Sequence, residues 1–269
     1  MRLLALVLSA GVLASCGNTG APPRVTESIT PAATTTSASP TTPAPLPLAG
    51  RTVVIDPGHQ LGNSRHTKQI NKRVSVGNGR KACNSTGAAT NRGYPEATFA
   101  FKVAQHMQQR LEKLGAKVIL TRTANSKALW GPCVDKRGRA GNKVKADVKI
   151  SIHGDGSAAG NHGFHVIAPK ALMELTASIA KPSHAFAVDL RRALVRADFS
   201  TSTYTGGADA INIRSDLGTL NLSKIPVAMV ELGNMRNARD AAVMSSSKGQ
   251  KRYAKALVAG VRFFLSSRP

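Results

Sequence analysis

The sequence is poor in acidic and aromatic residues. Only 14 of its 269 residues are Asp or Glu, against 37 Lys or Arg, and aromatic residues make up 4%. Arg2, Arg24 and Glu27 are the only charged residues before Arg51, so the rest of the chain carries a net charge of +22. A basic surface of this size attracts polyanions. We expect no nucleic acid partner, because the chain has few aromatic side chains for base stacking and no recognisable nucleic-acid-binding motif.

A long hydrophobic run is also missing. The most apolar stretch, Leu3 to Ala14, follows Arg2 and is too short to cross a bilayer, which takes about 20 residues. This pattern is typical of an export signal, and we assign residues 1–15 to a signal peptide cleaved before Cys16. The letters LASC at 13–16 resemble the lipobox of bacterial lipoproteins, which implies a lipid anchor on Cys16. An ordinary signal peptide with an incidental cysteine is the alternative.

The next segment, residues 16–50, has almost no charge and few large apolar side chains. It consists mostly of Ser, Thr, Ala and Pro, a composition that cannot offset the entropy of ordering a backbone. We therefore predict a lipidated cysteine followed by a disordered tether. Such a chain would be exported to the cell envelope and held at the outer face of the cytoplasmic membrane only through its anchor. In that compartment the basic charge favours anionic cell-wall polymers.

Cysteine is scarce as well. Besides Cys16 the chain has only Cys83 and Cys133. An oxidising compartment would join this even pair by a disulfide. Two free thiols are the alternative.

Residues 51–269 are long enough for one sizeable domain. Runs of β-branched residues alternate with segments of helical periodicity, which predicts a single α/β domain with a mostly parallel, twisted sheet and helices on both faces. The polar stretch 60–94 has no period and is predicted to be a long loop. No uncovered apolar face stands out, so we expect a monomer. The expected strands are 51–56, 117–122, 148–156, 163–169, 210–215 and 225–234, and the expected helices are 95–114, 134–146, 183–197 and 249–265.

Polar residues end three of the expected strands: His59, His153 and Glu231. Groups beyond the carboxyl ends of strands in such a sheet converge on one crevice, and Glu96, at the start of a helix, lies on the same rim. Two imidazoles, one carboxylate and an open position form a catalytic zinc site, and the other carboxylate could act as general base. A lone histidine at a strand end is more often structural. Glu231, however, follows the apolar run VAMV, where an unpaired carboxylate is costly.

Three stretches carry a family resemblance: VVIDPGH at 53–59, SIHGDG at 151–156 and VAMVELGNMRN at 227–237. In order, spacing and strand context they resemble the zinc-dependent N-acetylmuramoyl-L-alanine amidases, over nearly all of residues 51–265. The resemblance implies that His59, Glu96 and His153 bind one zinc ion and that Glu231 is catalytic. It also implies hydrolysis of the amide bond between N-acetylmuramic acid and L-alanine, with peptidoglycan and muropeptides as substrates. The basic loop and the Cys83/Cys133 pair resemble mycobacterial and related actinobacterial members.

Some assignments leave alternatives. Glu96 follows a long insertion and precedes Ala97, where the family usually has Glu-Lys, so His66 within the insertion is a competing ligand. Arg214 and Asn221 are candidates for substrate binding, Arg214 because a guanidinium grips a carboxylate in a fork; a surface role is as reasonable. His165 is a candidate for supporting the site from behind.

Two other functions stay open at this point. One is a non-catalytic cell-wall-binding lipoprotein that keeps the fold and the charge, and the other is a zinc peptidase that cuts elsewhere in the stem peptide. The intact His59, His153 and Glu231 favour catalysis. A glycosidase ranks last, because it needs two facing carboxylates and few acids lie outside the expected helices.

Overall fold

The computed structural model describes residues 20–21, 24 and 44–267. The chain divides into two units, Met1–Pro43 and Ala44–Pro269. The predicted signal peptide, Cys16 and most of the tether lie outside the described residues. Within the described residues, no helix is both long and apolar enough to cross a membrane.

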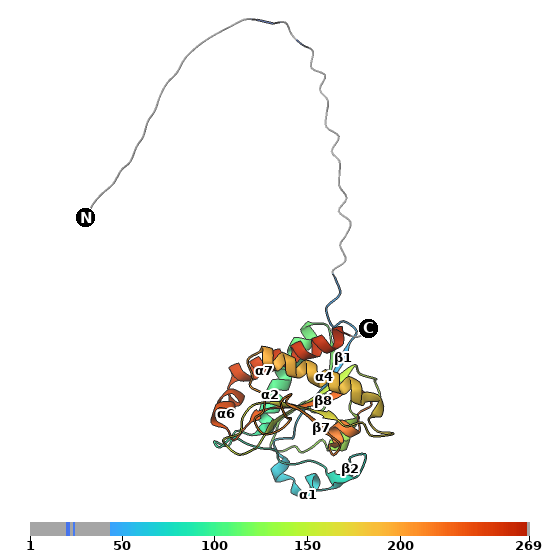
Figure 1. Ribbon diagram of the computed structural model, residues 1–269, viewed down its shortest axis with the longest axis vertical. Helices are drawn as coiled ribbons and strands as arrows, with labels where there is room; N and C mark the ends of the chain where they lie inside the picture. The colour runs from blue at the N-terminus through green and yellow to red at the C-terminus, as the bar shows by residue number, and fades with distance from the viewer. Residues whose placement is uncertain (1–19, 22–23, 25–43, 268–269) are drawn as a thin grey trace, which may run out of the picture. The chain divides into compact units, whose positions relative to one another are not determined.

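The second unit is built on a six-stranded sheet (Figure 1). All pairings are parallel except the one between the strands His165–Pro169 and Val227–Asn234. The predicted α/β fold with a mostly parallel sheet is therefore confirmed. The strand order is β4 (Lys117–Leu120), β1 (Thr52–Pro57), β5 (Val148–Asp155), β8 (Val227–Asn234), β6 (His165–Pro169) and β7 (Ile211–Arg214).

Helices cover both faces of this sheet. One face carries α2 (Glu96–Lys113), α4 (Ala177–Arg196) and α7 (Ser247–Ser266); α2 and α4 pack on the strands, and α7 packs on both of these helices (Figure 1). The other face carries the short helices α3 (Val134–Arg139) and α5 (Gly218–Asn221). Helix α6 (Ala238–Ser245) follows β8.

The core follows from the alternation of side chains along the strands. In β1, Val53 and Ile55 belong to the large cluster under α2, α4 and α7, whereas Val54 belongs to a small cluster on the opposite face. Helix α2 adds a stripe at helical spacing, which includes Val103, Met107 and Leu111, all fully buried. The strands are thus held from both sides, and their carboxyl ends form a rigid rim.

The polar stretch 60–94 contains more structure than the loop we predicted. It holds a 3₁₀ turn (Asn63–Arg65), α1 (Thr67–Ile70) and an antiparallel hairpin of β2 (Arg73–Ser75) and β3 (Arg80–Ala82). A disulfide between Cys83 and Cys133 attaches the base of this hairpin to the segment before α3. We refer to residues 73–82 as the hairpin.

Several boundaries differ from the sequence-based expectation. Helix α3 ends at Arg139 rather than Ala146, because Gly141 turns the chain with φ +84°. Helix α4 begins at Ala177 rather than Ser183 and includes Pro182, which removes one main-chain hydrogen bond near the helix start. The compact unit also begins before Arg51, since Leu48 is buried and its N–H donates to Leu114 O.

Candidate active site

The turn after β1 holds His59 over the carboxyl end of the sheet. His59 has φ +54°, a region that costs a residue other than glycine of order 1–3 kcal/mol. Gly58 precedes His59 and lies against the imidazole of His153. A Cβ at Gly58 would be 2.6 Å from Nδ1 of His153. The two rings pack edge to face, with their centroids 4.9 Å apart.

His59, Glu96 and His153 meet at one point on the sheet rim. Glu96 is the first residue of α2 and His153 lies in β5. One oxygen, Glu96 Oε1, is 3.1 Å from Nε2 of His59 and 2.9 Å from Nδ1 of His153. One ligand atom from each residue lies within 4.8 Å of the others, so the group could hold a metal ion. His66 lies outside this group, between the 3₁₀ turn and α1.

Main-chain groups fix the orientation of these side chains. Nδ1 of His59 faces the Ser85 carbonyl at 3.1 Å, so it carries a proton and makes Nε2 the nitrogen that would bind a metal ion. Glu96 Oε2 accepts the Ala88 N–H at 2.7 Å, and Oε1 accepts the Gly154 N–H at 3.2 Å. The donor set of two imidazoles and one carboxylate, each held in place, fits a zinc ion.

The electrostatics of the site couple these groups. Burial alone would raise the pKa of Glu96, but the charge of His59 and hydrogen bonds from both imidazoles outweigh it and hold the pKa below its ordinary value. For His59, burial lowers the pKa, and the charge of Glu96 more than compensates, so the pKa is raised. Glu96 is therefore a carboxylate at neutral pH, which is the form that binds a cation.

Glu231 lies beside this cluster on the neighbouring strand. The register of β5 and β8 pairs it with His153, and both side chains line the same cavity. Glu231 Oε2 is covered, and no described group hydrogen-bonds to it. Burial, followed by the charges of Glu96 and Asp155, raises the pKa of Glu231 well above its ordinary value, against the opposing effect of Arg214. A carboxylate with a raised pKa and a free oxygen is suited to accept and return a proton.

The cavity in front of these residues has a volume of about 460 Å³. The strand ends form one side, and the hairpin with the loop that leads into α5 forms the other. Its charged lining is both basic and acidic. The lining residues outside the strand ends include Arg73, Val76, Lys81, Asp216, Leu217 and Thr219.

The structure gives the predicted substrate residues different settings. Arg214 is partly exposed and holds Asp216 through two hydrogen bonds of 2.9 and 2.8 Å. Asn221 is fully buried, and its amide donates to Val76, Asn78 and Ser215, so it fixes the hairpin from behind. The role of either residue in substrate binding stays a prediction.

His165 lies opposite Glu231 in the register of β6 and β8. Burial lowers the pKa of His165 to about 4, so the ring is neutral at physiological pH. Its Nδ1 is buried and has no hydrogen-bond partner among the described residues.

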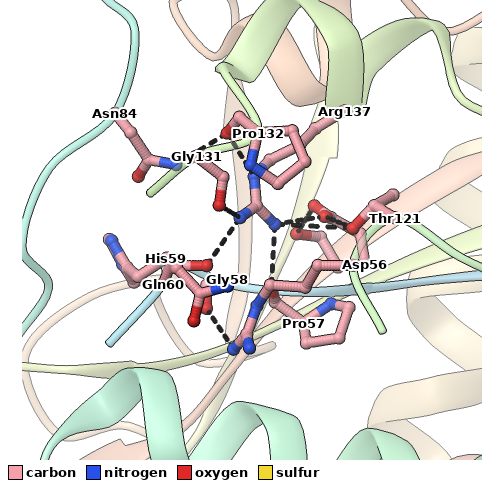
Figure 2. A network of polar contacts seen from close by, with 12 residues as sticks. Asp56, Pro57, Gly58, His59, Gln60, Asn84, Thr121, Gly131, Pro132 and Arg137 are labelled. Atoms are coloured by element: carbon pink, nitrogen blue, oxygen red, sulfur yellow. Dashed lines mark hydrogen bonds and ion pairs between the residues drawn. The ribbon is translucent and has the colours of Figure 1, made fainter. Parts of the chain in front are cut away.

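Sequence reasoning missed a buried polar network below the candidate metal ligands. Asp56 accepts hydrogen bonds from Thr121, Ser151 and Arg137. Figure 2 shows the Arg137 guanidinium between the Asp56 carboxylate and the carbonyl of His59. Arg122 is equally buried beside it. The only signal available in the sequence was that an acidic residue ends an apolar strand.

Comparisons with known proteins agree with this geometry. Residues 53–262 match the family model described as N-acetylmuramoyl-L-alanine amidase. The N-acetylmuramoyl-L-alanine amidase Rv3717 of Mycobacterium tuberculosis is 40% identical over 239 residues, which cover 88% of this chain and 95% of that protein.

Solved structures show the same relationship. The crystal structure of the amidase Ami1 from Mycobacterium smegmatis has a TM-score of 0.77 and 36% identity, and the match covers 82% of this chain and 99% of that one. Ami1 from Mycobacterium abscessus has a TM-score of 0.75 and 40% identity, with 81% and 99% covered. The fold, the converging strand ends and these relatives agree, and the chain belongs to the N-acetylmuramoyl-L-alanine amidase family.

Proposed function

We propose that the domain hydrolyses the amide bond between N-acetylmuramic acid and the L-alanine of the stem peptide, with one zinc ion per domain. The observation that carries the proposal is the position of Glu231. Glu231 lines the same cavity as His59 and His153 and lies on the strand next to His153, and its Oε2 has no hydrogen-bond partner among the described residues.

Metal binding and proton transfer fall to different residues of the site. His59, Glu96 and His153 would hold the zinc ion, which when bound activates water and polarises a carbonyl group. The carboxylate of Glu231 accepts the proton of the attacking water. As the amide C–N bond breaks, Glu231 returns this proton to the amine of L-alanine. The products are a free lactyl carboxylate on the glycan and a stem peptide with a free amino terminus.

The surroundings of the cavity support a peptide-bearing substrate. Arg214, at the end of β7, would bind a carboxylate of the stem peptide. This carboxylate would either bind beside Asp216 on the same guanidinium or take the place of Asp216. Asn221 would contribute by holding the hairpin that forms one wall of the cavity. Peptidoglycan and its soluble muropeptides are the substrates that match these groups.

The setting of the enzyme is part of the proposal. The export signal and Cys16 would place a monomeric, lipid-anchored enzyme in the cell envelope at the outer face of the cytoplasmic membrane. The Cys83–Cys133 disulfide is compatible with that compartment. The net charge of +22 from Arg51 onward would attract anionic cell-wall polymers.

Product mass spectrometry tests the bond that is cut. Muropeptides are incubated with the zinc-loaded domain, with the Glu231→Gln variant and with a chelated sample. Free stem peptide that starts with L-alanine, and that is absent from both controls, is the expected product. Cleavage at another bond would make the domain a zinc peptidase. Intact muropeptides that stay bound to the domain would indicate the non-catalytic binding protein instead.

A further inference from the structure

Two buried guanidinium groups donate hydrogen bonds to the carbonyls of Pro57, Gly58 and His59, the turn that carries the first proposed ligand. Arg122 donates to Pro57 O and Gly58 O, each at 3.0 Å. Arg137 donates to Pro57 O at 2.7 Å and to His59 O at 2.6 Å (Figure 2). The two side chains are only 5% and 3% exposed, and the hydrogen bonds to Pro57 O and Gly58 O are buried.

The turn needs such support because of its backbone conformation. His59 has φ +54°, in a sparsely populated region that a histidine keeps only when its surroundings impose it. Without the two guanidinium groups the turn could relax toward a more favourable φ. The imidazole would then leave the position in which Nε2 faces Glu96.

Arg122 also binds the main chain beside Glu96, the second proposed ligand. Its Nη2 donates to Ala97 O at 2.7 Å, in the first turn of α2 and next to Glu96. One guanidinium therefore joins the segment that carries His59 to the segment that carries Glu96. These two segments come from different parts of the chain, and the spacing between their ligand atoms depends on this link.

Arg137 is itself held in place by the strands. It forms an ion pair of 2.6 Å with Asp56, and Asp56 also accepts a hydrogen bond of 2.7 Å from Ser151 in β5, the strand that carries His153. Burial would raise the pKa of Asp56, but Arg137 and these hydrogen bonds hold it below its ordinary value. The carboxylate thus anchors the guanidinium against the centre of the sheet.

We propose that Arg122 and Arg137 are positioning residues that hold the metal ligands His59 and Glu96 at binding distance. The inference rests on the metal site of the proposed function. A contribution to stability alone is a weaker explanation, because a buried ion pair adds little net stability once its desolvation is counted. The donors also end on main-chain carbonyls of the ligand turn rather than on remote groups.

Arginine-to-lysine substitutions separate charge from geometry. An ammonium group keeps the charge but lacks the planar fork that reaches several carbonyls at once. The test uses Arg122→Lys and Arg137→Lys in residues 44–269. The match to Ami1 from Mycobacterium smegmatis covers 99% of the chain in that crystal structure. A domain of this extent therefore folds without further segments. Ser183→Ala is the matched control, because it removes a buried hydrogen bond from the Val227 N–H and touches neither Asp56 nor the turn carbonyls.

Three readouts distinguish positioning from stability. The zinc dissociation constant is measured by competition with a chromogenic chelator, the ligand geometry by the visible spectrum of the cobalt(II)-loaded protein, and stability by thermal melting without metal. We expect zinc binding to weaken about 10- to 100-fold in each lysine variant, with an altered cobalt spectrum. Ser183→Ala should lower the melting temperature and bind zinc like the parent.

Parent-like zinc affinity and cobalt spectra in folded lysine variants would overturn the inference while leaving the amidase proposal intact. If a lysine variant does not fold, the glutamine variant at the same position replaces it, because a neutral amide is less costly to bury and can donate to only part of the turn. A folded Arg122→Gln or Arg137→Gln with parent-like zinc affinity counts against the role of that arginine. A parent domain that binds no zinc would refute the metal site itself, and the inference would fall with it.

Discussion

At the scale of single residues, the proposed role of Glu231 is the most specific. Its side chain is not part of the ligand group, so Glu231→Gln should leave zinc affinity unchanged. Turnover of muropeptides should fall about 10²- to 10⁴-fold, the usual contribution of a general acid–base group. Glu112→Gln is the control, since Glu112 is an exposed carboxylate on α2 and its loss should not change turnover. Equal losses in both variants would argue against a specific role for Glu231.

Lys149 is a buried residue with a measurable pH signature. Burial lowers its pKa to about 7, against the opposing charge of Asp56, and its Nζ donates to Gly138 O at 2.5 Å. Between pH 7 and its ordinary pKa, the unfolded chain binds a proton that the folded chain does not. Raising the pH across this interval therefore stabilises the folded protein.

The Lys149→Met variant isolates this effect. From pH 7 to about pH 9, the free energy of unfolding of the parent should rise relative to the variant by up to about 1.4 kcal/mol per pH unit. Urea denaturation of both metal-free proteins at several pH values measures the difference. Two parallel pH profiles would show that the Lys149 pKa is not lowered by folding.

The residues of the site were predictable to different degrees. His59, His153 and Glu231 stand out in the sequence because each one ends an apolar strand. Glu96 stands out only through its place at a helix start and through the family resemblance. Arg122 and Arg137 could not be predicted, because their burial depends on carbonyls from segments far away in the sequence, and arginine is otherwise a surface residue in this basic chain.

At the scale of secondary-structure elements, the hairpin depends on its disulfide. Cys83 and Cys133 enclose a segment with a sequence separation of 50, and a cross-link of that span contributes about 4 kcal/mol in the chain-entropy model. Replacing both cysteines with serine should lower the free energy of unfolding by about this amount. Chemical denaturation measures it.

The hairpin also has an ion pair that serves as the comparison. Lys81 and Asp216 are 2.6 Å apart, and both side chains are nearly half exposed. An exposed pair contributes less than about 1 kcal/mol, so Lys81→Gln should cost far less stability than the loss of the disulfide. A larger effect of Lys81→Gln would show that the hairpin is held mainly by this ion pair.

The elements themselves were predictable where burial imposes a period. Strands β1, β5 and β8 are apolar runs, and α2 has a clear stripe. The hairpin was missed, because its strands have three residues each and none of these residues is buried, which leaves no alternation. The start of the domain was placed late, because Leu48 is an isolated apolar residue in a Pro- and Ala-rich segment.

At the scale of the whole molecule, the excess of basic residues should govern adsorption. The Debye length, over which salt screens a charge, falls from about 30 Å at 0.01 M salt to about 10 Å at 0.1 M. Binding of the domain to dextran sulfate, a soluble anionic polymer, should therefore weaken at least about 10-fold over this interval. Neutral dextran is the control and should not bind. Retention on dextran sulfate that does not change with salt would contradict an electrostatic origin.

The two glycines next to the proposed metal ligands limit which substitutions this protein can accept. Gly58 lies against His153, and a Cβ at Gly87 would be 2.8 Å from Glu96 Oε2 and 2.9 Å from Cδ2 of His59. Gly87 also has φ +79°, so strain and crowding act together there. One methyl group at either position would occupy space that the ligands need. Substitutions elsewhere can change the hairpin or the surface charge. At these two positions only glycine, which has no side chain, leaves the ligands in place.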